Sequence, residues 1–187
     1  MNFKQALLIS LILGACTSTV VGPYSFIHIP VSSDTFDIAT WQNTSDTTTP
    51  IHIYIEGDGH AFDRHGRPTK DPTPRKLLVR NMAAKDNNPN VAYIGRPCQY
   101  IKNKNCDVSD WTDGRFSSDA VDAVHNAIKT VAKGRPIILI GYSGGAMISG
   151  LVIKKYPDLN VKKWITVAGV LNHADWTKHF GDTPLKK

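Results

Sequence analysis

The segment from Ile137 to Gly145 constrains the fold more than any other part of the chain. The apolar run Ile137–Ile140 leads directly into the pattern Gly-x-Ser-x-Gly, with Ser143 at its centre. A buried strand followed by this pattern predicts a sharp strand-to-helix turn, which exposes the serine at the top of a parallel sheet. Ser143 is therefore the candidate nucleophile. The alternative interpretation is a plain glycine-rich turn between a strand and a helix.

The order of the remaining predicted elements indicates one α/β domain, residues 17–187. Alternating apolar and polar residues over 25–29 and 36–41 predict an antiparallel pair of strands at the start. From residue 51 onward, strands with nearly continuous apolar runs alternate with helices, as in a mostly parallel sheet covered by helices on both faces. Further strands are expected at 51–55, 91–94, 136–140 and 161–168, and helices at 75–85, 118–132 and 146–156.

A serine nucleophile needs backbone donors for the developing oxyanion and a base to take its proton. The donors predicted from the sequence are the N–H of Gly144, directly after the serine, and that of Asp58 or Gly59 in the turn after the strand 51–55. The alternative is that the turn after the strand 51–55 only ends that strand and has no role in binding an oxyanion.

His173, Asp175 and His179 follow the last predicted strand, at the same edge of the sheet as Ser143. His173 is the candidate base and Asp175 the candidate acid, although nothing in their spacing demands a triad. His60, Asp63 and His65 lie close together, but no further ligand pattern accompanies them, so we expect no metal and no cofactor.

The N-terminus has the features of an export signal. Lys4 precedes an apolar run, Ala6–Leu13, that is too short to span a membrane. The run ends in Leu-Gly-Ala-Cys, with Cys16 as the residue that a bacterial lipobox would lipidate. We therefore expect a signal peptide at 1–15 and a lipid anchor at Cys16, with an ordinary signal peptide as the alternative. By resemblance to enterobacterial-type lipoproteins, Thr17 after the cysteine favours the outer membrane, with the domain facing the periplasm.

Cys98 and Cys106 flank the polar loop Gln99–Asn105, and in an oxidising compartment they are expected to form a disulfide. Two free thiols would be expected only in the cytosol. The net charge of +6 is spread without a run of basic residues, which indicates a solvated surface and no nucleic-acid partner.

The chain also carries a set of short segments, spread over most of its length after residue 50, that together support a resemblance. They are Ile55–Gly59, Asp71–Arg75, Gly95–Tyr100, Trp111–Ser117, Gly141–Gly145 and Ala168–His173. With them the sequence resembles a group of bacterial proteins with the α/β-hydrolase fold, many of them lipoproteins. The resemblance implies that Ser143 is a nucleophile and suggests that Cys98 and Cys106 pair.

Members of that group continue beyond the position of Leu185 into further strands, so the sequence predicts a hydrolase domain truncated at its C-terminus. The expected function is a lipid-anchored serine hydrolase of esterase or lipase type, acting on small-molecule or lipid esters at the membrane. The alternative is an inactive truncated remnant, or an envelope binding module built on the same scaffold.

Overall fold

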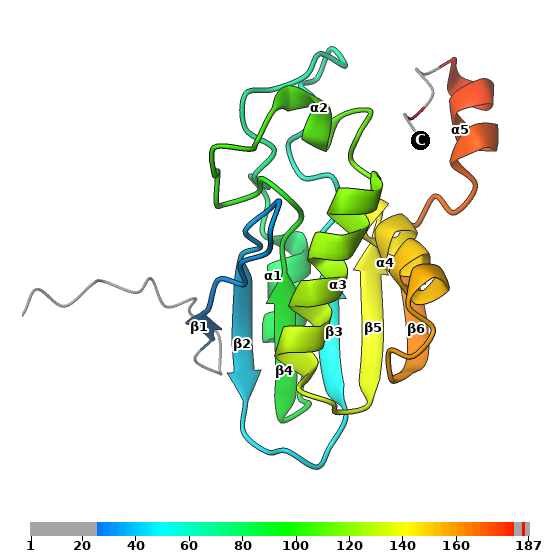
Figure 1. The fold of residues 1–187 in the computed structure, drawn as a ribbon. Coiled ribbons are helices and arrows are strands. Elements are labelled where there is room, and N and C mark those ends of the chain that lie inside the picture. Colours follow the sequence, from blue (N-terminus) through cyan, green and yellow to red (C-terminus); the bar gives the residue numbers. More distant parts are fainter. Residues whose placement is uncertain (1–25, 182–184, 186–187) are drawn as a thin grey trace, which may run out of the picture.

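The computed structural model describes residues 26–181 and 185, and its centre is a six-stranded sheet with the order β1-β2-β4-β3-β5-β6 (Figure 1). β2 pairs antiparallel with β1 and with β4, whereas β4, β3, β5 and β6 are mutually parallel. The strands are β1 (Ile27–His28), β2 (Thr40–Thr44), β3 (Ile51–Ile55), β4 (Asn90–Ile94), β5 (Ile137–Tyr142) and β6 (Val161–Val167).

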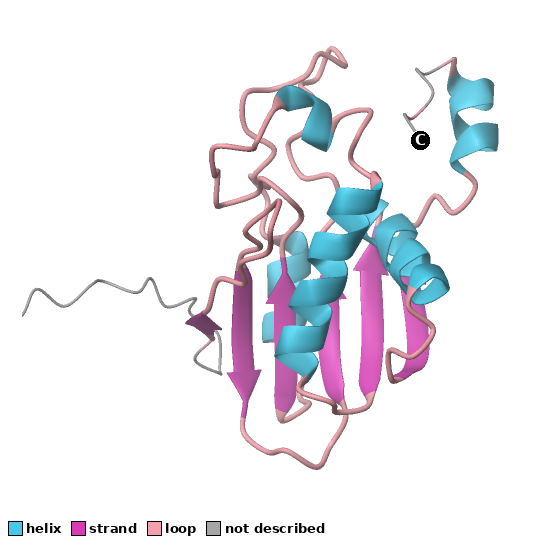
Figure 2. Cartoon of the chain, viewed as in Figure 1, coloured by secondary structure: helices cyan, strands magenta, loops and turns pink. Residues whose placement is uncertain are grey.

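Helices cover both faces of this sheet. In Figure 1, α3 and α4 lie in front of the strands and α1 lies behind them, while α2 and α5 lie beyond the upper end. Figure 2 shows that the long loops gather at this same end, above the tips of the parallel strands. The helices are α1 (Leu78–Ala84), α2 (Val108–Trp111), α3 (Ser118–Ala132), α4 (Gly144–Lys155) and α5 (His173–Phe180).

The core consists of two apolar layers, one on each face of the sheet. On one face Ile51, Ile53 and Leu139 pack against α3 and α4, and all three side chains are fully buried. On the other face Trp41, Tyr93 and their neighbours pack against α1. Cover on both faces explains why the central strands are nearly continuous apolar runs in the sequence.

The expected fold class is confirmed, and the strand 51–55 and the helix 118–132 occupy the predicted residues. The strand predicted at 36–41 is wrong in its position, because the ladder runs through Thr40–Thr44 instead. Phe36 and Ile38 are buried core residues before that ladder begins, and only Ile38 makes an isolated bridge, to Val31. Their alternation therefore reflects burial beside the sheet.

The predicted signal peptide at 1–15 and the lipid anchor at Cys16 lie outside the described residues. Within the part of the chain that the structure describes, no helix is both long and apolar enough to cross a membrane.

Candidate active site

Ser143 forms the junction between β5 and α4. Its backbone adopts φ 50° and ψ −120°, a conformation that residues with a side chain rarely occupy. Such strain persists where the surrounding structure over-determines it, and it clusters at functional sites. The Ser143 N–H donates to the Val167 carbonyl oxygen at 2.8 Å, which fixes the turn to the end of β6. The chain thus forms the sharp strand-to-helix turn expected for a nucleophilic serine.

The glycines around Ser143 allow α4 to start very close to the sheet. A Cβ atom at Gly145 would lie 2.4 Å from the Ile55 carbonyl oxygen, and one at Gly141 would lie 2.5 Å from the Cα atom of Ala146. Both distances are shorter than non-bonded atoms tolerate, so neither position accepts a side chain without a backbone shift. The pattern Gly-x-Ser-x-Gly is therefore required by close packing of the helix start on β3 and β5.

The segment Gly57–Asp58–Gly59, which we call the oxyanion turn after the role that the sequence predicts for it, follows β3 and lies beside the serine. A Cβ atom at Gly57 would lie 3.3 Å from the Ser143 Cβ atom. The N–H of Gly57 already donates to Glu56 Oε1 at 2.9 Å. Within the described chain, the N–H groups of Asp58 and Gly144 donate to no other residue. These two donors are therefore available to a substrate oxygen.

Glu56 lies directly beneath the oxyanion turn and is 4% exposed. Besides the Gly57 N–H, its carboxylate accepts the Tyr93 hydroxyl at 2.8 Å, and that hydroxyl lies 3.0 Å from the one of Tyr100. Burial raises the pKa of Glu56, and the hydrogen bonds from Tyr93 and Gly57 oppose that rise. A buried carboxyl group thus anchors the first residue of the turn.

The Asp58 side chain belongs to a charged cluster formed with Arg96, Arg115 and His173. Asp58 Oδ1 lies 3.2 Å from Arg96 Nη1, and Asp58 Oδ2 lies 3.1 Å from Arg115 Nε. The guanidinium of Arg96 also donates to the Arg115 carbonyl oxygen. Burial lowers the pKa of Arg96, while the adjacent Asp58 carboxylate works against that shift. The Asp58 carboxylate is therefore engaged by two arginines.

His173, the candidate base, lies at the first residue of α5 and joins the charged cluster. Its Nε2 atom lies 3.0 Å from Arg115 Nη2, and its ring packs edge-on against Phe116 at 5.6 Å between ring centroids. The carboxylate of Asp175, the candidate acid, accepts a hydrogen bond from the Asn172 side chain at the start of α5. The structure thus places His173 against Arg115, the arginine that also binds Asp58, and it places Asp175 against Asn172.

A cavity of about 520 Å³ opens beside the charged cluster, within the size range of small-molecule sites. Its walls are mixed, because Phe62 and Pro68 are apolar whereas Thr112, Asp113 and Arg115 are polar. The lining residues are Asp58, Phe62, Gly66, Pro68, Thr112, Asp113, Arg115, His173 and Thr177. Asp58, the central residue of the oxyanion turn, lines this cavity, whereas Ser143 does not belong to its lining.

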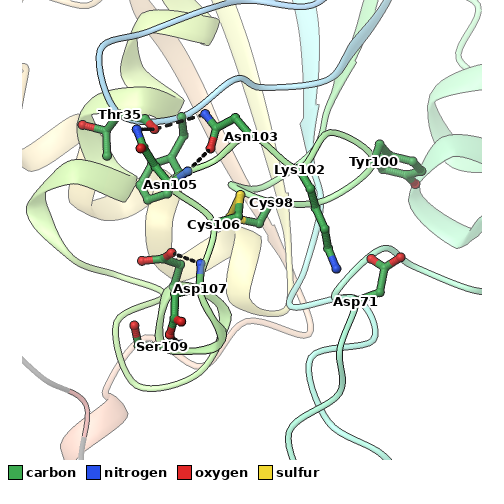
Figure 3. The surroundings of a disulfide bond; sticks show 12 residues. Thr35, Asp71, Cys98, Tyr100, Lys102, Asn103, Asn105, Cys106, Asp107 and Ser109 are labelled. Carbon is green, nitrogen blue, oxygen red and sulfur yellow. Dashed lines mark hydrogen bonds between the residues drawn. A yellow bond between two sulfur atoms is a disulfide. The ribbon is translucent and has the colours of Figure 1, made fainter.

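Cys98 and Cys106 form a disulfide with 5.7 Å between their Cα atoms (Figure 3). The loop that it closes is tied to the chain before β2, because the side-chain amides of Asn103 and Asn105 both donate to the Thr35 carbonyl oxygen, at 3.2 and 3.1 Å. The disulfide therefore fixes a loop at the upper end of the sheet.

Asp63, which lies between the two histidines considered for metal binding, has other partners. The carboxylate of Asp63, between His60 and His65, accepts hydrogen bonds from the backbone N–H of His65 and from Arg67. Over residues 26–181, no group of three or more His, Cys, Asp or Glu side chains is placed to hold a metal ion.

Arg96, Gln99 and Arg115 are residues of the site to which the sequence alone assigned no role. The available signal was their place in the segments Gly95–Tyr100 and Trp111–Ser117, which belong to the resemblance described above. Because their partners lie far away in the chain, the spacing of residues does not reveal them.

The fold agrees with comparisons to solved structures. The chain resembles a membrane phospholipase A described as a bacterial virulence factor, with 18% identity and a TM-score of 0.51 over 78% of this chain and 40% of the other. It also resembles Est1E from Butyrivibrio proteoclasticus, with 13% identity and a TM-score of 0.51 over 81% and 54% of the two chains. A third similar structure is a serine hydrolase from Cycloclasticus zankles, with 14% identity and a TM-score of 0.52 over 78% of this chain and 46% of the other.

These likenesses define the class of structure: the chain has the α/β-hydrolase fold. It spans about half or less of the length of these three proteins. No family model and no curated protein matches the sequence.

Proposed function

We propose that the protein is a serine hydrolase that cleaves ester bonds, with Ser143 as the nucleophile. The observation that carries the proposal is the strained conformation of Ser143 beside the N–H groups of Asp58 and Gly144, which have no acceptor among the described residues. Paired backbone donors next to a serine suit the tetrahedral intermediate of acyl transfer. The similar solved structures include a serine hydrolase and a phospholipase A, which supports this class of reaction.

In the proposed reaction, Ser143 Oγ attacks the ester carbonyl carbon and its proton passes to a base. The carbonyl oxygen becomes an oxyanion, which accepts hydrogen bonds from Gly144 and Asp58. The carbon–oxygen bond to the alcohol then breaks, the alcohol takes the proton, and water hydrolyses the acyl group from the serine. We assign the base to His173, which lies in the charged cluster, with Asp175 as the acid proposed from the sequence.

We further propose that the substrates are small-molecule or lipid esters and that the domain is anchored in the bacterial envelope through Cys16. The mixed apolar and polar walls of the cavity beside Asp58 suit an ester with both kinds of surface. Incorporation of labelled palmitate into the full chain, and its loss in Cys16→Ser, would test the anchor.

A second candidate function is a binding module that kept the scaffold without hydrolysis. It is favoured by the contact of His173 Nε2 with Arg115, because a nitrogen that accepts a hydrogen bond from a guanidinium does not take the serine proton in that arrangement.

A fluorophosphonate probe separates the two functions. The chain from residue 17 onward would be labelled beside a Ser143→Ala control, with circular dichroism to show that both are folded. Labelling that disappears in the control supports the hydrolase. A folded protein that does not react contradicts it and favours the binding module.

A further inference from the structure

Three loops from separate parts of the chain hold the oxyanion turn in place. From the loop before α1, Pro72 approaches so closely that a Cβ atom at Gly59 would lie 2.2 Å from its carbonyl oxygen. From the loop after β4, Gln99 contacts Gly57. From the loop after α2, Arg115 contacts Asp58. The turn is therefore clamped from several sides rather than left as a free strand end.

Gln99 makes the most direct of these contacts with the backbone of the turn. Its side chain is 1% exposed, and its Nε2 atom donates to the Gly57 carbonyl oxygen at 3.0 Å. Its Oε1 atom accepts from the N–H of Arg96 at 2.9 Å. Both ends of the amide thus bind main-chain groups, which fixes its orientation.

The contact with Gly57 determines the direction of the next N–H. The Gly57 carbonyl and the Asp58 N–H belong to one planar peptide, and no cis peptide bond occurs among the described residues. In a trans peptide these two groups point in opposite directions. Because Gln99 holds the Gly57 carbonyl, the Asp58 N–H points away from Gln99 and from the loop after β4 to which Gln99 belongs.

We propose that Gln99 is a positioning residue that fixes the Asp58 N–H as the second oxyanion donor beside Gly144. The inference rests on the proposed function, and it selects Asp58 over Gly59. Gly57 itself is not the donor, because its N–H binds Glu56.

The backbone around Gln99 supports this role. Cys98 and Tyr100, the residues on either side, have φ values of 66° and 64°, in the left-handed region that non-glycine residues avoid. The disulfide to Cys106 holds Cys98 (Figure 3). The Thr73 hydroxyl accepts the Tyr100 N–H at 2.8 Å. Two strained residues around one buried amide indicate that the loop is built to present Gln99.

The test compares Gln99→Met with Gln42→Met. Gln42 is also a buried glutamine, but its Nε2 atom donates to Thr40 Oγ1 within β2, at 2.8 Å, and not to the turn. For each protein we would measure kcat and KM on p-nitrophenyl acetate, the thermal midpoint, and hydrogen exchange of the peptide covering residues 56–60. Should Gln99→Met fail to fold, Gln99→Glu replaces it, because the glutamate keeps the length but presents an acceptor to the Gly57 carbonyl.

We expect Gln99→Met to lower kcat by about 10-fold or more with little change in KM, approaching the roughly 100-fold effect of losing one oxyanion donor. Hydrogen exchange at residues 56–60 should also become faster in Gln99→Met. Gln42→Met should change neither kcat nor this exchange, even if its thermal midpoint falls as much as that of Gln99→Met. Unchanged exchange and kcat in Gln99→Met, or equal effects in both variants, overturns the inference. A wild-type protein without hydrolysis contradicts the proposed function alone, and exchange at residues 56–60 still decides whether Gln99 positions the turn.

Discussion

Asp58 Oδ1 lies 3.2 Å from Nη1 of Arg96, whose side chain is only 5% exposed. The pair joins the oxyanion turn after β3 to the loop after β4, and the same carboxylate also reaches Arg115. The guanidinium of Arg96 is buried and has lost its hydration. Its positive charge is therefore tolerated in the folded state only because the Asp58 carboxylate lies beside it. The turn that presents the candidate oxyanion donor is thus fixed by a buried charge as well as by Gln99.

Removal of this carboxylate in Asp58→Ala is expected to lower the free energy of unfolding by about 3 kcal/mol, because a buried guanidinium is left without its partner. Urea denaturation at pH 7 measures the loss. The control is Asp63→Ala, whose partner Arg67 has a side chain that is 73% exposed. That exposed ion pair contributes little, so the loss in Asp63→Ala should be clearly smaller than in Asp58→Ala. Equal losses in the two variants would show that burial does not govern the Asp58–Arg96 pair.

Glu56 gives a pH dependence of known sign. Because burial raises the pKa of Glu56, the folded protein keeps the proton above the ordinary value of 4.5, where the unfolded chain has released it. The folded state therefore binds more protons in that window, and the contribution of Glu56 to stability falls as the pH rises from about 4.5 to the folded pKa. Above the folded pKa this contribution is constant.

The variant Glu56→Gln should remove this decrease in stability with rising pH, because glutamine does not titrate, while its amide oxygen still accepts the Gly57 N–H. Urea unfolding of both proteins at several values between pH 4 and pH 8 measures the difference in the free energy of unfolding. We expect the wild type to lose stability relative to the variant as the pH rises. Two profiles that stay parallel over the whole range would contradict the raised pKa.

The sequence predicted those features that depend on local periodicity. The strand 51–55 is fully buried at alternate residues and half-buried between them, and the helix 118–132 has one buried side, so each leaves a regular apolar pattern. The strand predicted at 36–41 was misplaced because Phe36 and Ile38 are buried without belonging to the β2 ladder. A buried loop and a buried strand give the same alternation.

The position of Ser143 followed from its flanking residues, whereas its surroundings did not. The partners of Asp58 are Arg96 and Arg115, at sequence separations of 38 and 57 residues, and Gln99 lies 42 residues from Gly57. Contacts between irregular loops over such distances leave no periodic signal. α5 was also missed, because the segment before it resembled a loop and its eight residues leave only Thr177 buried.

The disulfide gives a third prediction, tested in the double variant Cys98→Ser/Cys106→Ser, which leaves no free thiol in the loop. Its two cysteines are 8 residues apart. Closing a loop of that length lowers the conformational entropy of the unfolded chain, which stabilises the folded state by about 2.5 kcal/mol. We expect a loss of this size in urea denaturation. Because Cys98 precedes Gln99, exchange at residues 56–60 should also become faster. Reduction of the wild type should reproduce both effects, and a reduced protein as stable as the oxidised one would contradict the prediction.

β6 leads to the last prediction, which concerns self-association. β6 is an edge strand of the sheet, and within the described chain it pairs with β5 alone. Trp164 and Ile165 are both 39% exposed, but they face opposite sides of the sheet. Trp164 packs toward α4, where its Nε1 atom donates to Ser149 Oγ at 2.9 Å. Ile165 is therefore the better position for a charge.

An exposed apolar strand at a sheet edge favours pairing with another chain. We expect sedimentation velocity on the chain from residue 17 onward to show self-association at concentrations of about 10–100 μM. Ile165→Lys should shift the protein toward the monomer. The matched control is Leu78→Lys on α1, where the leucine is 50% exposed but lies away from the edge. A monomeric wild type, or an equal shift in both variants, would show that β6 is not the surface through which the chains associate.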